Sequence, residues 1–125
     1  MTPEPLRGRR HCGDVRFTVS DGVGALACHC DDCRKSHDND MAFLAAPAAS
    51  VKVEGAEHLT WYDSSEHARR GFCRWCGGRL FKAIGERWMV ALGAIEGPTG
   101  LRFVQPLRVE SKGDGYDVPE VEGAR

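Results

Sequence analysis

The six cysteines of this 125-residue chain stand in three motifs whose spacing suits metal binding. Three of them share one short segment, two form a Cys-x-x-Cys pair, and one precedes a glycine: Cys28, Cys30 and Cys33, then Cys73 and Cys76, then Cys12. Thiols two or three residues apart can converge on one ion, because a tight turn brings their sulfur atoms within reach of a tetrahedral zinc. The pattern therefore predicts two zinc sites.

The first predicted site has three thiols in six residues. A structural zinc usually has four protein ligands, whereas a catalytic zinc usually has three and leaves one position open. Cys28, Cys30 and Cys33 therefore favour a catalytic zinc, provided that no distant residue completes the shell. His29 lies between two of them and should point away from the sulfur atoms in an extended segment. His37 is a candidate base or ligand, or a residue of a solvated loop.

The second predicted site combines distant parts of the chain. Cys73 and Cys76 are followed by two glycines, which permit the left-handed turn of a zinc knuckle. A redox dithiol is the alternative, but the glycines and the lack of a βαβ pattern favour the knuckle. Cys12 is the evident third ligand, and no fourth is evident. The neighbouring His11 should face the other way if this segment is extended.

Charge and hydropathy restrict the class of protein. The chain has 17 basic and 18 acidic residues and a net charge of −1; six thiolates and two Zn²⁺ ions would lower it by two, to −3. Neither value shows the basic excess of nucleic-acid-binding proteins, so we expect no nucleic-acid partner. No apolar stretch approaches the ~20 residues of a membrane span, and residues 1–7 lack a secretory signal's apolar region.

We therefore expect a cytoplasmic protein without a membrane partner, in a reducing compartment where clustered cysteines bind metal. Three disulfides in a secreted domain are the alternative. The sequence makes no prediction of the oligomeric state.

Short apolar runs between glycines predict a mostly β fold. The expected strands show alternation or β-forming residues and cover residues 15–19, 26–27, 41–46, 51–54, 59–62, 79–84, 88–92 and 101–104. A helical turn is expected at 31–36 and a hairpin turn at 85–87. We expect one domain over residues 9–110, a flexible arm at 1–8 and a poorly ordered tail at 111–125.

Three segments together resemble the glutathione-dependent formaldehyde-activating enzyme family, which includes centromere protein V. They are His11-Cys12-Gly13-Asp14-Val15-Arg16-Phe17, Cys28-His29-Cys30-Asp31-Asp32-Cys33-Arg34-Lys35 and Arg70-Gly71-Phe72-Cys73-Arg74-Trp75-Cys76-Gly77. The resemblance covers roughly residues 8–95. It implies a single-domain β-tent-like fold of short antiparallel strands with two zinc-binding cysteine clusters.

The resemblance also implies which cysteines share a metal. Cys28, Cys30 and Cys33 would hold a catalytic zinc, and Cys12, Cys73 and Cys76 would belong to a structural zinc. The family's fourth structural cysteine falls on Arg10, whose guanidinium is always protonated and cannot bind a metal. His11, water or another residue would complete that site, or its zinc would be weak or absent.

The function implied by the resemblance is a carbon–sulfur lyase reaction on a thiol–aldehyde adduct. Its type reaction joins glutathione to formaldehyde as S-hydroxymethylglutathione, so glutathione is a possible co-substrate. Arg34, Lys35, Arg69 and Arg70 are candidates for binding its carboxylates. The main alternative is a non-catalytic zinc module for a protein partner. A reductase role ranks last, because it needs a reactive cysteine that is not a zinc ligand.

Overall fold

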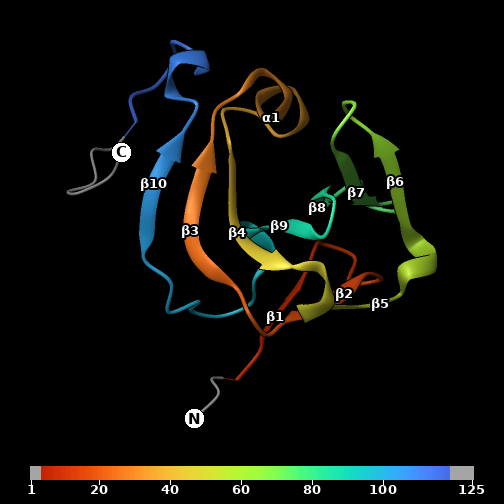
Figure 1. Cartoon of the computed structure of the whole chain (residues 1–125). Helices are drawn as coiled ribbons and strands as arrows, with labels where there is room; N and C mark the ends of the chain where they lie inside the picture. The colour runs from red at the N-terminus through yellow and green to blue at the C-terminus, as the bar shows by residue number, and fades with distance from the viewer. Residues whose placement is uncertain (1–3, 119–125) are drawn as a thin grey trace.

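The structure is a computed structural model that describes residues 4–118 (Figure 1). Its strands are β1 (Leu6–Arg9), β2 (Arg16–Val19), β3 (Val23–Cys28), β4 (Met41–Pro47), β5 (Val51–Glu54), β6 (Leu59–Asp63), β7 (Arg69–Cys73), β8 (Arg79–Ile84), β9 (Arg87–Ala91) and β10 (Phe103–Leu107). One α-helix, α1, spans Asp31–Ser36, and single 3₁₀ turns span Ala48–Ser50, Ala56–His58, Leu92–Ala94 and Val109–Ser111. The predicted mostly β class is confirmed.

The strands form two sheets. The smaller has the order β1-β2-β5, and the larger has the order β10-β3-β4-β9-β8-β7-β6. All of these neighbours pair antiparallel except β3 and β10, which are parallel. Most expected strands are present with similar bounds, and α1 coincides with the expected helical turn. The sequence pattern did not predict β1 or β7.

Aromatic side chains pack the two sheets together. Phe17 of β2 contacts Phe81 of β8 edge to face, with ring centroids 5.2 Å apart. Trp61 and Trp88 pack beside Phe81, so these two tryptophans belong to the core. A second, smaller core cluster contains Cys28 and Cys33 and places the first cysteine motif at the end of the large sheet.

Helix α1 lies beside the ends of β3 and β4, at the same end of the molecule as the loop between β6 and β7 (Figure 1). Ser64 of that loop donates a 3.3 Å hydrogen bond to Asp32 of α1. Strand β7 runs away from this point and ends at Cys73. One strand thus connects the surroundings of both cysteine motifs.

Both ends of the described chain contact the domain. β1 begins inside the segment expected to be a flexible arm and pairs with β2; residues 1–3 lie outside the described residues. In the segment expected to be a poorly ordered tail, Tyr116 contacts His29; residues 119–125 lie outside the description. None of the helices in residues 4–118 has the length and apolarity needed to cross a bilayer.

Candidate metal centres

The structure brings all six cysteines into two groups. In each group the three sulfur atoms lie within 4.8 Å of one another. We call them the Cys28 cluster (Cys28, Cys30 and Cys33) and the Cys12 cluster (Cys12, Cys73 and Cys76). Within residues 4–118, no histidine, aspartate or glutamate joins either group as a further ligand. Both clusters can therefore hold a metal ion through three thiolates.

The Cys28 cluster is built where β3 turns into α1. Cys28 ends the strand, and Cys30 is the N-cap of the helix, with its Sγ accepting a 3.4 Å hydrogen bond from the Cys33 N–H. An N-cap acceptor satisfies an amide that has no partner inside the helix. Asp31 and Asp32 occupy the first turn, where negative charge is favoured by the helix dipole. A local helix start thus sets the spacing of the three thiols.

Two buried cations converge on Cys33. Arg70 of β7 is 2% exposed and Lys82 of β8 is 7% exposed. The Arg70 guanidinium donates to Cys33 Sγ at 3.3 Å, and the Lys82 ammonium does so at 3.6 Å. The same two groups lie 2.9 Å and 3.8 Å from the Asp32 carboxylate. Buried charges are tolerated when they are paired, so this arrangement requires negative charge on Cys33 as well as on Asp32.

These contacts determine which thiols of the metal-free cluster keep their protons. The pKa of Cys33 is lowered to about 5, first by a hydrogen bond from the Cys28 thiol and then by Arg70 and Lys82, against the effect of burial. The pKa of Cys28 is raised because its thiol donates to Cys33 and because it is buried. The Cys30 N–H donates to Cys28. Every sulfur therefore has a donor that suits a thiolate, and the cluster fits a divalent soft metal.

His29 points away from the sulfur atoms, as expected from its place between Cys28 and Cys30. Its side chain is buried and its Nδ1 is hydrogen bonded to the Tyr116 hydroxyl, which donates to the Asn39 carbonyl at 2.9 Å. Since the hydroxyl proton is used on Asn39, the Nδ1–H of His29 is the donor to Tyr116. His29 thus anchors the C-terminal segment.

An open groove of about 830 Å³ leads to the Cys28 cluster. Its lining includes Cys28, Cys30, Lys82 and Arg108. Arg108 is exposed, has a φ of 56° and forms no ion pair within residues 4–118. An uncommon backbone conformation in a non-glycine residue is a feature of many functional sites.

None of the four side chains expected to bind carboxylates lines this groove. Arg34 pairs with Asp31, Arg69 pairs with Asp63, and Arg70 is buried against the cluster. Neither Lys82 nor Arg108 was predicted from the sequence as a residue of this site. A lysine between apolar Leu80 and Ile84 in one strand was the available signal for Lys82, because alternate residues share a face. Arg108 carries no comparable signal in the sequence.

The Cys12 cluster is held by two turns. The Gly13 N–H donates to the Arg10 carbonyl at 3.1 Å, and the Gly77 N–H donates to the Cys73 carbonyl at 2.9 Å. Gly13 and Gly77 both have a φ of 74°, so the left-handed turn expected after Cys76 is present. Cys12 Sγ lies 3.4 Å from Cys73 Sγ.

Amide groups also point at these sulfur atoms. The pKa of Cys76 is lowered to about 7, first by the Cys12 N–H and also by the Gly78 N–H. The Trp75 N–H donates to Cys73 at 3.4 Å. Arg10 packs against Gly78, where an added Cβ would lie 2.5 Å from Arg10 Cγ, and burial lowers the pKa of Arg10 against the opposing charge of Cys76. The side chain at position 10 therefore faces the cluster without supplying a metal ligand.

Comparisons with known proteins agree with this architecture. The chain is similar to a protein of Rhodobacter sphaeroides of known crystal structure, with 29% sequence identity and a TM-score of 0.67. The match covers 80% of this chain and 98% of that one. The sequence profile of the glutathione-dependent formaldehyde-activating enzymes matches residues 5–108. With most of its length and both cysteine clusters inside that match, the chain belongs to the glutathione-dependent formaldehyde-activating enzyme family.

Proposed function

We propose that this protein is a zinc-dependent carbon–sulfur lyase acting on a thiol–aldehyde adduct such as S-hydroxymethylglutathione. The observation that supports the proposal most is the Cys28 cluster itself: three thiols, two buried cations and an open groove meet at one point. Three protein ligands leave one zinc position for substrate, as in catalytic sites. Zinc bound there would supply Lewis acidity and lower the pKa of a substrate thiol.

The buried cations would adjust the charge of this centre. Three thiolates and one Zn²⁺ together carry one negative charge, and Asp32 adds another. Arg70 and Lys82 offset both charges, so an incoming thiolate would not meet a net negative site. Coulomb interactions are stronger in a partly buried site than in water, which makes this neutralisation important for anion binding.

In the lyase direction, the adduct loses the proton of its hydroxyl group to water and its carbon–sulfur bond breaks. The electron pair of that bond stays on sulfur, which leaves as a thiolate, and the carbon becomes the carbonyl carbon of formaldehyde. Lys82 lines the groove and its ammonium would stabilise the developing negative charge. Arg108, which also lines the groove, would bind a substrate carboxylate.

The test measures bound zinc and the rate of formaldehyde exchange with glutathione in wild type, Cys30→Ser and Cys76→Ser. We expect Cys30→Ser to lose one zinc ion and the rate enhancement, and Cys76→Ser to keep the enhancement. Arg108→Ala should raise KM with little effect on kcat, because it acts in binding. An enhancement that survives Cys30→Ser would refute the proposed site.

The second candidate is a non-catalytic zinc module that binds a protein partner. Trp75 favours it, because this side chain is 60% exposed on the Cys73–Cys76 turn and the Arg74 guanidinium lies 4.9 Å from its ring centroid. Tryptophan and arginine are enriched at interaction hot spots. Full zinc loading without rate enhancement on any thiol–aldehyde adduct would select this function.

A further inference from the structure

We propose that the Cys12 cluster is a second ligand-accepting metal site, which binds zinc through three thiolates and takes its fourth ligand from solution as a small anionic thiol. This inference does not depend on the lyase activity proposed for the Cys28 cluster. It rests on the donor set, the exposure of the sulfur atoms and the charges around them.

The donor set of the Cys12 cluster is incomplete for a closed zinc site. Cys12, Cys73 and Cys76 bring their sulfur atoms within 4.8 Å of one another, and no further His, Cys, Asp or Glu of residues 4–118 joins them. Structural zinc almost always has four protein ligands. His11, the nearest imidazole in the sequence, is exposed and lies outside this group. One position therefore remains for an external ligand.

The sulfur atoms are accessible on one side. Cys12 and Cys76 are exposed, whereas Cys73 is 1% exposed and closes the inner side of the cluster. In the Cys28 cluster two of the three cysteines, Cys28 and Cys33, are buried instead. A ligand can thus reach the Cys12 cluster directly from solvent, without entering the groove.

The backbone prepares these sulfur atoms for a metal. Amide N–H groups of Asp14, Trp75 and Gly78 donate to Cys12, Cys73 and Cys76 respectively. Hydrogen bonds from amides favour the charged form of a thiol, which is the form that binds metal. The two turns therefore hold three sulfur atoms in an arrangement that suits a metal ion.

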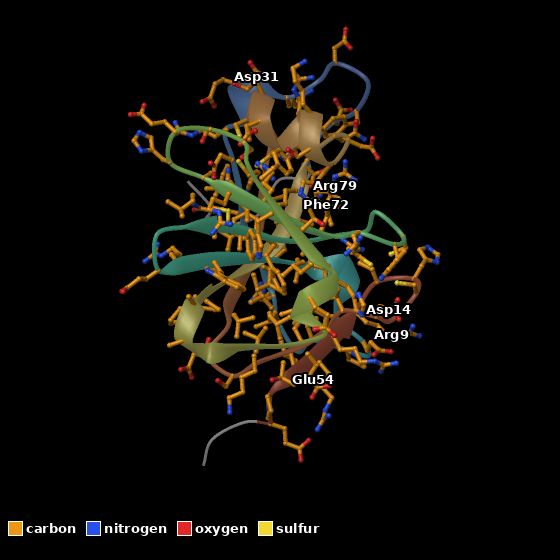
Figure 2. The ribbon with its side chains drawn as sticks, turned by 90° about the vertical axis from the view of Figure 1, so that its right-hand side faces the viewer. Arg9, Asp14, Asp31, Glu54, Phe72 and Arg79 are labelled. Atoms are coloured by element: carbon orange, nitrogen blue, oxygen red, sulfur yellow. The ribbon has the colours of Figure 1, made fainter. Side chains whose placement is uncertain are left out.

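Four arginines surround the cluster, and each donates to a backbone carbonyl of its turns or of the adjoining strand. The contacts are Arg9 to His11, Arg16 to Gly13, Arg79 to Gly77 and Arg10 to Arg79, at 3.4, 3.1, 3.2 and 2.6 Å. Among residues 4–118, only Arg9 of these four has a carboxylate partner, Glu96 at 3.4 Å. In Figure 2, Asp14 and Arg9 lie on one side of the molecule, close to a group of sulfur atoms.

These charges select the ligand. Three thiolates and Zn²⁺ carry one negative charge, and Glu96 and Asp14 add two. The four arginines and Arg74 of the Cys73–Cys76 turn leave the site with two positive charges. A metal with three sulfur ligands accepts a further thiolate well, and the positive rim favours a thiol that also bears a carboxylate. Arg10 packs against Gly78 and its charge interacts with Cys76, so it is the arginine that we expect to contact that carboxylate.

The experiment titrates the Co²⁺-substituted protein with mercaptoacetate, 2-mercaptoethanol and acetate, and follows the visible absorption of the metal. We expect mercaptoacetate to change the spectrum, with an affinity roughly three- to tenfold above that of 2-mercaptoethanol. Acetate should have little effect. The response should persist in Cys30→Ser, in which the Cys28 cluster is disabled, and disappear in the double variant Cys30→Ser/Cys76→Ser, which separates this site from the Cys28 cluster.

Two substitutions of Arg10 complete the test. Arg10→Cys places a fourth thiol beside Gly78, so it should tighten zinc binding and abolish the thiol response. Arg10→Gln keeps a donor for the Arg79 carbonyl but removes the charge. The affinity for mercaptoacetate should therefore fall toward the affinity for 2-mercaptoethanol. These variants are measured in the Cys30→Ser background, so that the Cys28 cluster does not contribute. A thiol response that remains there in both Cys76→Ser and Arg10→Cys would overturn the proposal, as would failure of the Cys12 cluster to bind metal in Cys30→Ser alone.

Discussion

Arg70 and Lys82 are direct cross-strand partners in the antiparallel pair of β7 and β8, and both are buried. Like charges placed opposite each other in a sheet repel and destabilise it. Here the Cys33 sulfur and the Asp32 carboxylate lie between the two cations and receive contacts from both. The sheet register itself thus fixes a positive environment for one cysteine of the Cys28 cluster.

Replacing Lys82 by methionine should weaken zinc binding at the Cys28 cluster. The substitution keeps much of the side-chain volume but removes a charge 3.6 Å from Cys33 Sγ. Residues that contact metal ligands typically change affinity by about 10- to 100-fold, and we expect about tenfold. Competition with a chromophoric chelator measures the zinc affinity. Lys82→Arg is the matched control and should retain most of the affinity; equal affinities for wild type and Lys82→Met would contradict this role.

Arg70→Met should lower the free energy of unfolding more than Arg69→Met, which is its matched control. The Arg70 side chain is 3% exposed and is paired with Asp32, whereas that of Arg69 is 58% exposed. Removing one partner of a buried ion pair costs about 3 kcal/mol. An exposed pair contributes less than about 1 kcal/mol. Urea unfolding should therefore separate the two variants clearly, and similar midpoints would show that Arg70 is not needed for folding.

Gly55→Ala should be much more destabilising than Gly85→Ala. Both glycines have positive φ, 78° and 59°, so both substitutions share a backbone cost of about 1–2 kcal/mol. At Gly55 an added Cβ would also lie 2.0 Å from the Asp14 carbonyl oxygen, whereas at Gly85 nothing lies within 4 Å. Thermal unfolding should show an extra loss of about 2 kcal/mol for Gly55→Ala. Because Asp14 adjoins the Cys12 turn, metal binding there should weaken as well.

The stability of the fold should decrease with acidification through His37. Burial, followed by the charge of Arg70, lowers the pKa of this imidazole to about 4. Its ordinary value is about 6.5, so the unfolded chain takes up a proton first as the pH falls. The stabilising contribution is complete above about pH 6.5 and is lost progressively down to about pH 4. Urea unfolding across this range should show that the free energy of unfolding depends less steeply on pH in His37→Gln than in wild type. The exposed His67 gives the control, because His67→Gln should keep the pH dependence of wild type.

Tyr116→Phe should release the C-terminal segment from the domain. The hydroxyl accepts from His29 Nδ1 and donates to the Asn39 carbonyl, so its removal leaves the buried imidazole donor without its partner. Such a loss costs about 1–3 kcal/mol. Hydrogen exchange should become faster in residues 109–118 and remain unchanged in β8. Unchanged exchange in both regions would mean that this contact does not hold the segment.

The sequence by itself determined which cysteines form each cluster and most of the strands. Motif spacing and alternating hydropathy are local properties, and the helix start at Cys30 depends only on its immediate neighbours. The sequence did not reveal strand β7, because its two arginines and a glycine give a weak strand signal. Gly71 becomes part of a strand because Trp61 of β6, its cross-strand partner, packs over it.

The tertiary structure decided what surrounds the clusters. Arg70 and Lys82 meet at Cys33 only because β7 and β8 are neighbours in that register. Similarly, Arg9, Arg16 and Arg79 gather around the Cys12 cluster from three different strands. Strand order and register depend on contacts between distant residues, which no local pattern encodes. The cysteines of both clusters are therefore visible in the sequence, while the electrostatics that act on them arise from the fold.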